Sequence, residues 1–106
     1  MSDKDARSNR GVSRQASGEY KVSGLLDLDT VADYRDAGFE AVRREAETVR
    51  FDMSEAHVDG SAVIALLIAW QREAEREKKQ VKFVNCPDNL LAIADACGVS
   101  EILQCG

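Results

Sequence analysis

The chain has few of the residues and motifs on which nucleotide and metal chemistry depends. It contains a single histidine and three cysteines without Cys-x-x-Cys spacing, which are too few ligands for a zinc site. It has neither a Gly-x-x-x-x-Gly-Lys-Ser/Thr loop nor a Gly-x-Gly-x-x-Gly turn, the glycine-rich segments that hold nucleotide phosphates. We therefore expect no nucleotide hydrolysis, no metal and no other cofactor. His57 could activate Ser61, but no third group is evident that would orient its imidazole. We therefore predict that His57 is a loop residue and not part of a catalytic site.

Basic residues and long apolar runs are also scarce. The chain has 14 Lys and Arg against 19 Asp and Glu, which gives a formal net charge of −5 and a pI near 4.8. Nucleic acids and anionic lipid surfaces are bound through clustered Lys and Arg, so this balance argues against both. No apolar N-terminal stretch resembles a signal peptide or a spanning helix. We expect protein partners, no direct membrane insertion and a cytoplasmic location.

The length limits the chain to one domain with one modest core, since it has 106 residues. Residues 1–18 are rich in Ser, Arg, Asp and Gly, and Val12 is their only sizeable aliphatic residue besides Met1. Such a segment cannot offset its ordering entropy by burial, so we predict a flexible polar tail or a weak edge strand near residues 12–15. The folded domain is predicted to span residues 19–106.

Strand and helix patterns alternate from Glu19 onward. Period-two alternation predicts strands at residues 19–26, 48–54 and 81–85. Helical spacing and end signals predict helices at residues 31–45, 61–79 and 87–97. Such alternation implies parallel neighbouring strands joined by right-handed crossovers. The predicted fold class is therefore α/β, a mostly parallel open sheet of about four strands flanked by helices.

Residues 52–69 are the most informative segment, because they predict a buried strand, a short turn and then an apolar helix. The turn places the Ser61 hydroxyl beside the Asp59 carboxylate at the helix start. Unpaired N–H groups and the helix dipole make such a position tolerant of an oxygen-rich group such as a phosphoryl. Two interpretations stay open: Ser61 is a phosphoacceptor that acts as a switch, or Asp59 and Ser61 only cap the helix.

The helix after this turn is apolar on two sides in its first half. The residues expected to lie on the sheet are Val63, Leu66, Leu67, Trp70 and Ala74. The residues on the opposite side are Ile64, Ala65, Ile68 and Ala69. The second apolar side is covered either by a neighbouring helix or by another protein, and the pattern does not choose between them.

Four short motifs occur in the order of a known family. They are Gly-Leu-Leu-Asp at residues 24–27, Asp-Met-Ser at 52–54, Val-Asp-Gly-Ser-Ala at 58–62, and Gly-Val at 98–99. Together they resemble a STAS domain, the module shared by sulfate transporters and anti-sigma factor antagonists, over about residues 19–103. The resemblance implies an open sheet flanked by helices, no enzymatic activity, and regulation of a protein partner through the turn before the second helix.

One branch of the family is the most similar. Residues 65–72, and residues 83–87 followed by Leu90, Leu91 and Ala94, resemble the small cytoplasmic STAS subunit of Mla phospholipid ABC transporters. This resemblance implies a non-catalytic accessory protein that binds and stabilises the transporter's ATPase subunit, at the inner face of the inner membrane through that partner. The expected partner-binding residues are Asp59, Gly60, Ser61, Ala62, Ile64, Ala65 and Ile68.

Two alternatives remain beside this first choice. In anti-sigma factor antagonists the phosphorylated serine corresponds to Ser61, next to the aspartate at Asp59, and the partners are an anti-sigma factor and a serine kinase. A structural homodimer would bury the same apolar helix face against its own copy. One position departs from the Mla pattern, because Gly60 stands where those subunits often have Thr or Ser. Either the hydroxyl has moved to Ser61, or the turn acts through its shape and backbone.

Overall fold

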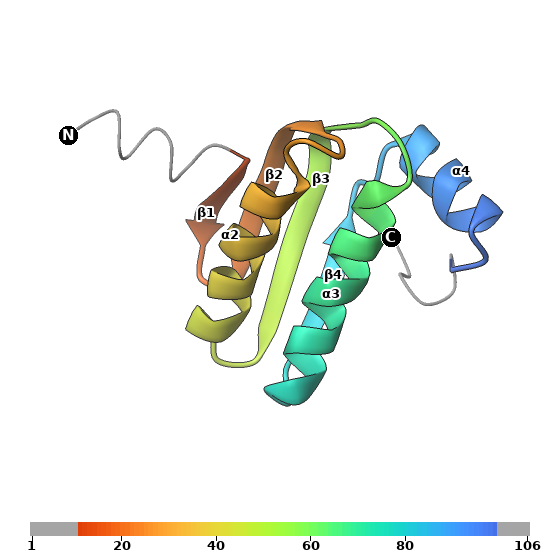
Figure 1. Cartoon of the computed structure of the whole chain (residues 1–106). Coiled ribbons are helices and arrows are strands. Elements are labelled where there is room, and N and C mark those ends of the chain that lie inside the picture. Colours follow the sequence, from red (N-terminus) through yellow and green to blue (C-terminus); the bar gives the residue numbers. More distant parts are fainter. Residues whose placement is uncertain (1–10, 100–106) are drawn as a thin grey trace.

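Strands and helices alternate along the chain after an initial hairpin (Figure 1). The computed structural model describes residues 11–99. The elements are β1 (Val12–Ala16), β2 (Glu19–Leu26), α2 (Val31–Arg44), β3 (Thr48–Val58), α3 (Ala62–Arg76), β4 (Gln80–Val84) and α4 (Asp88–Ala96). The predicted order of elements is confirmed, although α3 and α4 end slightly earlier than the sequence pattern indicated.

The four strands form one sheet in the order β1-β2-β3-β4. β1 is antiparallel to β2, whereas β2 with β3 and β3 with β4 pair in parallel. α2 and α3 lie side by side over one face of this sheet (Figure 1). The predicted α/β class with a mostly parallel open sheet is confirmed. Of the two predictions for residues 12–15, the edge strand is observed and Val12 is buried, while residues 1–10 lie outside the described part of the chain.

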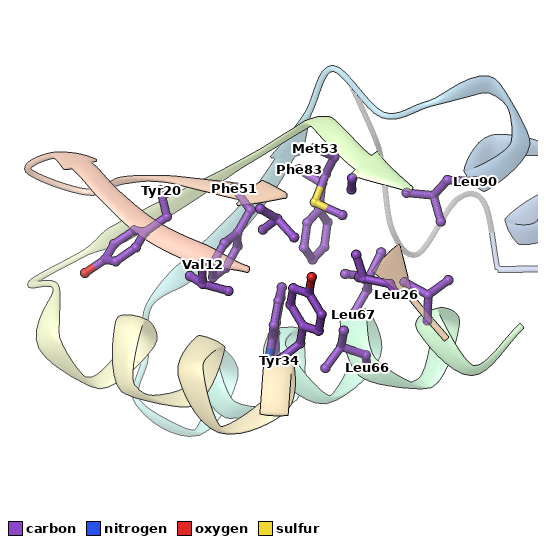
Figure 2. Packing of buried hydrophobic residues seen from close by; sticks show 14 of the residues in the cluster. Val12, Tyr20, Leu26, Tyr34, Phe51, Met53, Leu66, Leu67, Phe83 and Leu90 are labelled. Atoms are coloured by element: carbon purple, nitrogen blue, oxygen red, sulfur yellow. The ribbon is translucent and has the colours of Figure 1, made fainter. Parts of the chain in front are cut away.

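Aromatic rings from the sheet and α3 form the centre of the core (Figure 2). The Phe51 ring stacks on Trp70 with centroids 4.5 Å apart and on Phe83 with centroids 5.9 Å apart. The predicted sheet-facing side of α3 is confirmed, because none of its residues is more than 2% exposed. Those residues are Val63, Leu66, Leu67, Trp70 and Ala74.

β3 continues well past its predicted end at Ser54 because a bulge changes its alternation. Lys21 of β2 pairs with Asp52 of β3, whereas Ser23 pairs with Glu55, so β3 contains one extra residue in this interval. The Asp52 carboxylate accepts a hydrogen bond from the Ser54 backbone N–H at 2.9 Å, which gives the bulged amide a partner. The bulge shifts the buried set by one position. The buried residues of β3 are Val49, Phe51, Met53, Ala56 and Val58.

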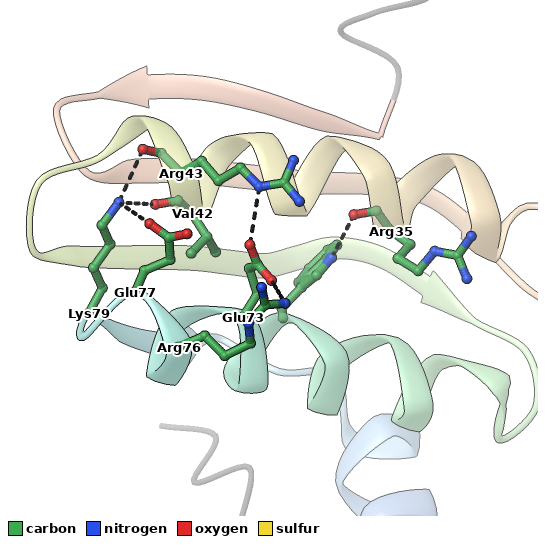
Figure 3. A network of polar contacts seen from close by, with 8 residues as sticks. Arg35, Val42, Arg43, Glu73, Arg76, Glu77 and Lys79 are labelled. Carbon is green, nitrogen blue, oxygen red and sulfur yellow. Dashed lines mark hydrogen bonds and ion pairs between the residues drawn. The ribbon is translucent and has the colours of Figure 1, made fainter.

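Polar contacts join the C-terminal halves of α2 and α3 (Figure 3). The buried Glu73 carboxylate accepts hydrogen bonds from Arg43 Nε and Arg76 Nη1, each at 3.1 Å. Lys79 Nζ donates to the carbonyl oxygens of Val42 at 2.8 Å and Arg43 at 3.1 Å. These carbonyls belong to the last turn of α2, where no intrahelical donor is available to them. The contacts fix α3, and therefore the turn before it, relative to α2.

Candidate functional site

The turn between β3 and α3 consists of three exposed residues, Asp59, Gly60 and Ser61. The Asp59 N–H donates to the Leu26 carbonyl at 2.9 Å, which continues the β2–β3 pairing by one bond. Gly60 has a φ of +93°, and nothing lies within 4 Å of a Cβ built on it. Glycine is therefore needed for the backbone conformation and not for space. The turn is fixed at its first residue and open to solvent beyond it.

Ser61 is the N-cap residue of α3, but its hydroxyl does not cap the helix. Its backbone has φ −84° and ψ −4°, which is helical, and no side-chain capping hydrogen bond is made. Its carbonyl accepts a bond from the Ile64 N–H at 3.0 Å. A capping side chain normally requires an extended N-cap residue, so the helical backbone explains why the capping interpretation is wrong for Ser61. The exposed hydroxyl is left for solvent, a modification or a partner.

The loop between β2 and α2 lies next to this turn and is held by its own side chains. One Asp27 carboxylate oxygen accepts hydrogen bonds from the Asp29 N–H at 2.9 Å and the Thr30 N–H at 3.1 Å. The Thr30 hydroxyl donates to the Leu25 carbonyl at 2.8 Å. This pinned loop presents Leu28, which is 79% exposed. Leu28 was not among the residues predicted from the sequence. Its position between Asp27 and Asp29 could have indicated an exposed leucine.

The start of α4 reaches the same edge of the sheet. Asn89 Nδ2 donates to the Val58 carbonyl at 2.8 Å, at the last residue of β3. The β2–α2 loop, the β3–α3 turn and the start of α4 therefore meet where the parallel strands end (Figure 1). In open α/β sheets, this carboxyl edge of the strands is where ligands usually bind.

The outer side of α3 is only partly exposed. Ala65 is exposed, Ala62 and Ile68 are half-buried, and Ile64 is 6% exposed. The prediction that Ile64 faces outward is wrong, since it belongs to the same buried cluster as the sheet-facing residues. α3 packs against α2 as well as against the sheet. The buried side of α3 is therefore wider than the side that faces the sheet. A neighbouring element thus covers part of the second apolar side, and Ala65 and Ile68 remain toward solvent.

A buried carboxylate lies at the opposite end of β2. Glu45 accepts hydrogen bonds from Tyr20 Oη at 2.7 Å, Arg14 Nε at 2.9 Å and the Gly18 N–H at 2.9 Å. The bond from Arg14, followed by that from Tyr20, holds the pKa of the Glu45 carboxyl below its ordinary value. Burial, followed by the bond to Glu45, raises the pKa of Tyr20 to about 12. The cluster fastens the β1–β2 hairpin to the end of α2, so its role is structural.

Two sequence predictions concern the metal-ligating side chains and the position of His57. No group of three or more His, Cys, Asp and Glu side chains within residues 11–99 could hold a metal ion. His57 lies in β3 and not in a loop, because the bulge extends that strand, and its side chain is exposed. Over the same residues, no helix is long and apolar enough to cross a membrane.

The family model described as "Mlab, STAS domain" matches residues 12–104. The chain belongs to the Mlab STAS family. No curated protein matches this STAS domain. The match spans every strand and helix of the described fold.

Solved structures share the fold of this STAS domain. A chain of the Acinetobacter MlaFEDB complex in its ATP-bound Vtrans2 conformation is 24% identical, with a TM-score of 0.74 over 90% of this chain and 100% of that chain. A chain of the same complex in its ATP-bound Vtrans1 conformation is 23% identical, with a TM-score of 0.69 over 88% of this chain and 98% of that chain. The anti-sigma factor antagonist SpoIIAA in its unphosphorylated form is 14% identical, with a TM-score of 0.69 over 90% of this chain and 85% of that chain.

Proposed function

We propose that this STAS domain is a non-catalytic accessory protein that binds and stabilises the ATPase subunit of a phospholipid ABC transporter of the Mla type. The observation that supports the proposal most is the Mlab family match over residues 12–104. The similarity to a chain of the MlaFEDB complex, over the full length of that chain, agrees with it. In this role the chain lies on the cytoplasmic side of the inner membrane through its partner, without a cofactor of its own.

The proposed contact surface is the β3–α3 turn together with the solvent side of α3. Asp59, Gly60 and Ser61 are exposed, and Ala65 continues the surface along the helix. The half-buried Ala62 and Ile68 complete it. Because Gly60 has no side chain, a partner can approach the backbone of the turn closely.

Ile64 has a different role from the other residues proposed for binding. It is 6% exposed, so it supports the surface from inside the domain. A domain that binds only the folded ATPase subunit stabilises that subunit by mass action. The proposed function needs no chemistry beyond such binding.

The direct test mixes the purified chain with the purified ATPase subunit of the transporter from the same organism. Size-exclusion chromatography should show a joint complex, and the thermal midpoint of the ATPase subunit should rise with the concentration of the chain. Separate elution with an unchanged midpoint would contradict the proposal. The chain alone, measured at dilute concentration, tests the homodimer: a stable dimer that excludes the ATPase subunit would favour the structural alternative.

A second candidate function is that of an anti-sigma factor antagonist controlled by phosphorylation of Ser61. The observation in its favour is the exposed Ser61 hydroxyl, which makes no capping bond at the start of α3. The shared fold with SpoIIAA agrees with this candidate. Incubation with a serine kinase encoded beside the gene, followed by mass spectrometry, tests it: phosphate on Ser61 would support this function, and an unmodified Ser61 would contradict it.

A further inference from the structure

The negative charge of the chain is concentrated at the carboxyl edge of the sheet. Three segments form this acidic edge: residues 24–34, 57–66 and 85–93. They contain no Lys or Arg, and their five acidic residues are Asp27, Asp29, Asp33, Asp59 and Asp88. Residues 11–99 contain 16 acidic residues, and the 11 that lie outside these three segments are matched in number by 11 Lys and Arg. The formal net charge of residues 11–99, which is also −5, therefore falls on the acidic edge.

Exposed leucines occur on the same segments. Among residues 11–99, the large hydrophobic side chains that are exposed are Leu25 at 48%, Leu28 at 79% and Leu91 at 40%. Single exposed leucines are common on protein surfaces, but here they coincide with the one region that holds the net charge. An apolar centre with a charged surround is the usual composition of a protein-binding surface.

Leu28 is the leucine best placed to act as an anchor. Its loop is pinned by the hydrogen bonds of Asp27 and Thr30, so the backbone that carries Leu28 is in place before any partner arrives. A preorganised loop loses less conformational entropy on binding than a mobile one. The bond from the Asp59 N–H to the Leu26 carbonyl holds this loop directly beside the β3–α3 turn. Leu28 therefore extends the same surface.

We infer that Leu28 is the apolar anchor of the docking surface and is seated in a hollow on the ATPase subunit that is rimmed by Lys and Arg. The inference rests on the proposed function. Charge complementarity identifies the occupant, because an acidic rim attracts a basic protein surface and speeds its association. The same rim repels the anionic lipids of a bacterial inner-membrane surface, so a lipid headgroup layer is disfavoured as the occupant.

The anchor is tested by binding kinetics between the intact chain and the purified ATPase subunit. Leu28→Ala should weaken the affinity by about tenfold, mainly through faster dissociation, because the apolar surface buried in the interface is reduced. Its circular dichroism and thermal midpoint should stay unchanged, because Leu28 is 79% exposed. The control Gln15→Ala shortens another exposed side chain, on β1, and should bind as the unmodified chain does.

The acidic rim is tested by the salt dependence of association. The association rate of the unmodified chain should fall as the salt concentration rises. Asp29→Asn should associate more slowly at low salt, and its association rate should depend less on salt. Glu47→Gln makes a matched charge change between α2 and β3, at the opposite edge, and should have no effect. An association rate that does not respond to salt would overturn the assignment of a basic partner surface.

The outcomes distinguish the anchor from the function on which it rests. No binding by the unmodified chain would overturn the proposed function together with this occupant. Binding that is equally tight for Leu28→Ala would overturn the anchor alone. The unmodified chain and Leu28→Ala are also sedimented with phosphatidylglycerol vesicles. If the unmodified chain binds these vesicles and Leu28→Ala does not, the acidic edge binds lipid and the inference is overturned.

Discussion

A Cβ atom on Gly38 would overlap the indole ring of Trp70, so the missing side chain allows α2 to lie against α3 at this point. Trp70 also donates from Nε1 to the Arg35 carbonyl at 3.2 Å, one turn earlier in α2. The ring is thus held between the sheet and the backbone of α2. Because the β3–α3 turn leads directly into α3, this contact also sets where the turn lies.

Gly38→Ala should destabilise the domain. Alanine favours a helix over glycine by about 1 kcal/mol. The overlap with Trp70 forces the two helices apart, and overpacking of this kind costs about 1–3 kcal/mol or more. We expect a net loss in the free energy of unfolding, measured by urea denaturation.

The control for this prediction is the same change made in a Trp70→Phe background. A smaller ring leaves space for the new methyl group, so Gly38→Ala should cost less there than in the unmodified chain. Such coupling is expected between residues in direct contact. Equal costs in the two backgrounds would show that the overlap does not limit the helix packing.

Local patterns predicted most of the fold because burial is periodic within single elements. The sheet-facing residues of α3 follow helical spacing, and all of them are buried. The bulge after Met53 was not predictable in this way, since one inserted residue reverses which side chains face the core. The strand pattern therefore ended too early, and His57 was wrongly assigned to a loop.

Interactions between distant segments were outside the reach of local patterns. Glu45 lies 31 residues from Arg14, and Glu73 lies 30 residues from Arg43. Neither carboxylate differs in sequence from the exposed glutamates around it. For the same reason the burial of Ile64 depends on the packing of whole helices, which the helical period alone does not give.

Leu66→Ala should cost about 2–5 kcal/mol in the free energy of unfolding, the range for a buried leucine whose site cannot collapse. The Leu66 side chain is 2% exposed between α3 and the rest of the core (Figure 2). Leu91→Ala provides the matched control, because Leu91 is 40% exposed and surface changes usually stay within about 0.5 kcal/mol. Similar losses for both variants, measured by urea denaturation, would contradict the packing described for α3.

Stability should fall on the acid side through Glu45. Its folded pKa is lowered by the bonds from Arg14 and Tyr20, so the unfolded chain takes up protons first as the pH decreases. The stabilisation is present above the unfolded pKa of 4.5 and is lost as the pH falls through the folded value. Glu45→Gln should lower the stability at neutral pH and flatten the acid limb, measured as thermal midpoint against pH. An acid limb that keeps its slope in Glu45→Gln would assign the acid loss to other carboxylates.

The alkaline side should depend on Tyr20, with the opposite sign. Its folded pKa is raised from 10.0 to about 12, first by burial and then by the bond to Glu45. A raised pKa stabilises the fold fully below the unfolded value, and the benefit is lost between pH 10 and about 12. Tyr20→Phe removes the ionising group, so the thermal midpoint should fall less steeply over this range. An identical slope in Tyr20→Phe would show that Tyr20 does not determine the alkaline limb.

Ser61→Asp should leave the domain folded and weaken its binding to the ATPase subunit. The Ser61 hydroxyl makes no capping bond, so its loss removes no contact, and a carboxylate is compatible with the positive end of the helix dipole. In the complex, however, the new charge would have to be desolvated close to Asp59. Misplaced like charges at an interface cost several kcal/mol.

Phosphorylation of Ser61 would add about −1.5 to −2 charges at the same place and should act in the same direction. The matched control is Ser17→Asp, which introduces the same charge on an exposed serine between β1 and β2, at the other end of β2. Recovery of the ATPase subunit on the immobilised chain should drop for Ser61→Asp and stay at the unmodified level for Ser17→Asp, with unchanged circular dichroism for both. If Ser61→Asp retains full recovery, the β3–α3 turn lies outside the interface, and its exposed hydroxyl has no part in binding this partner.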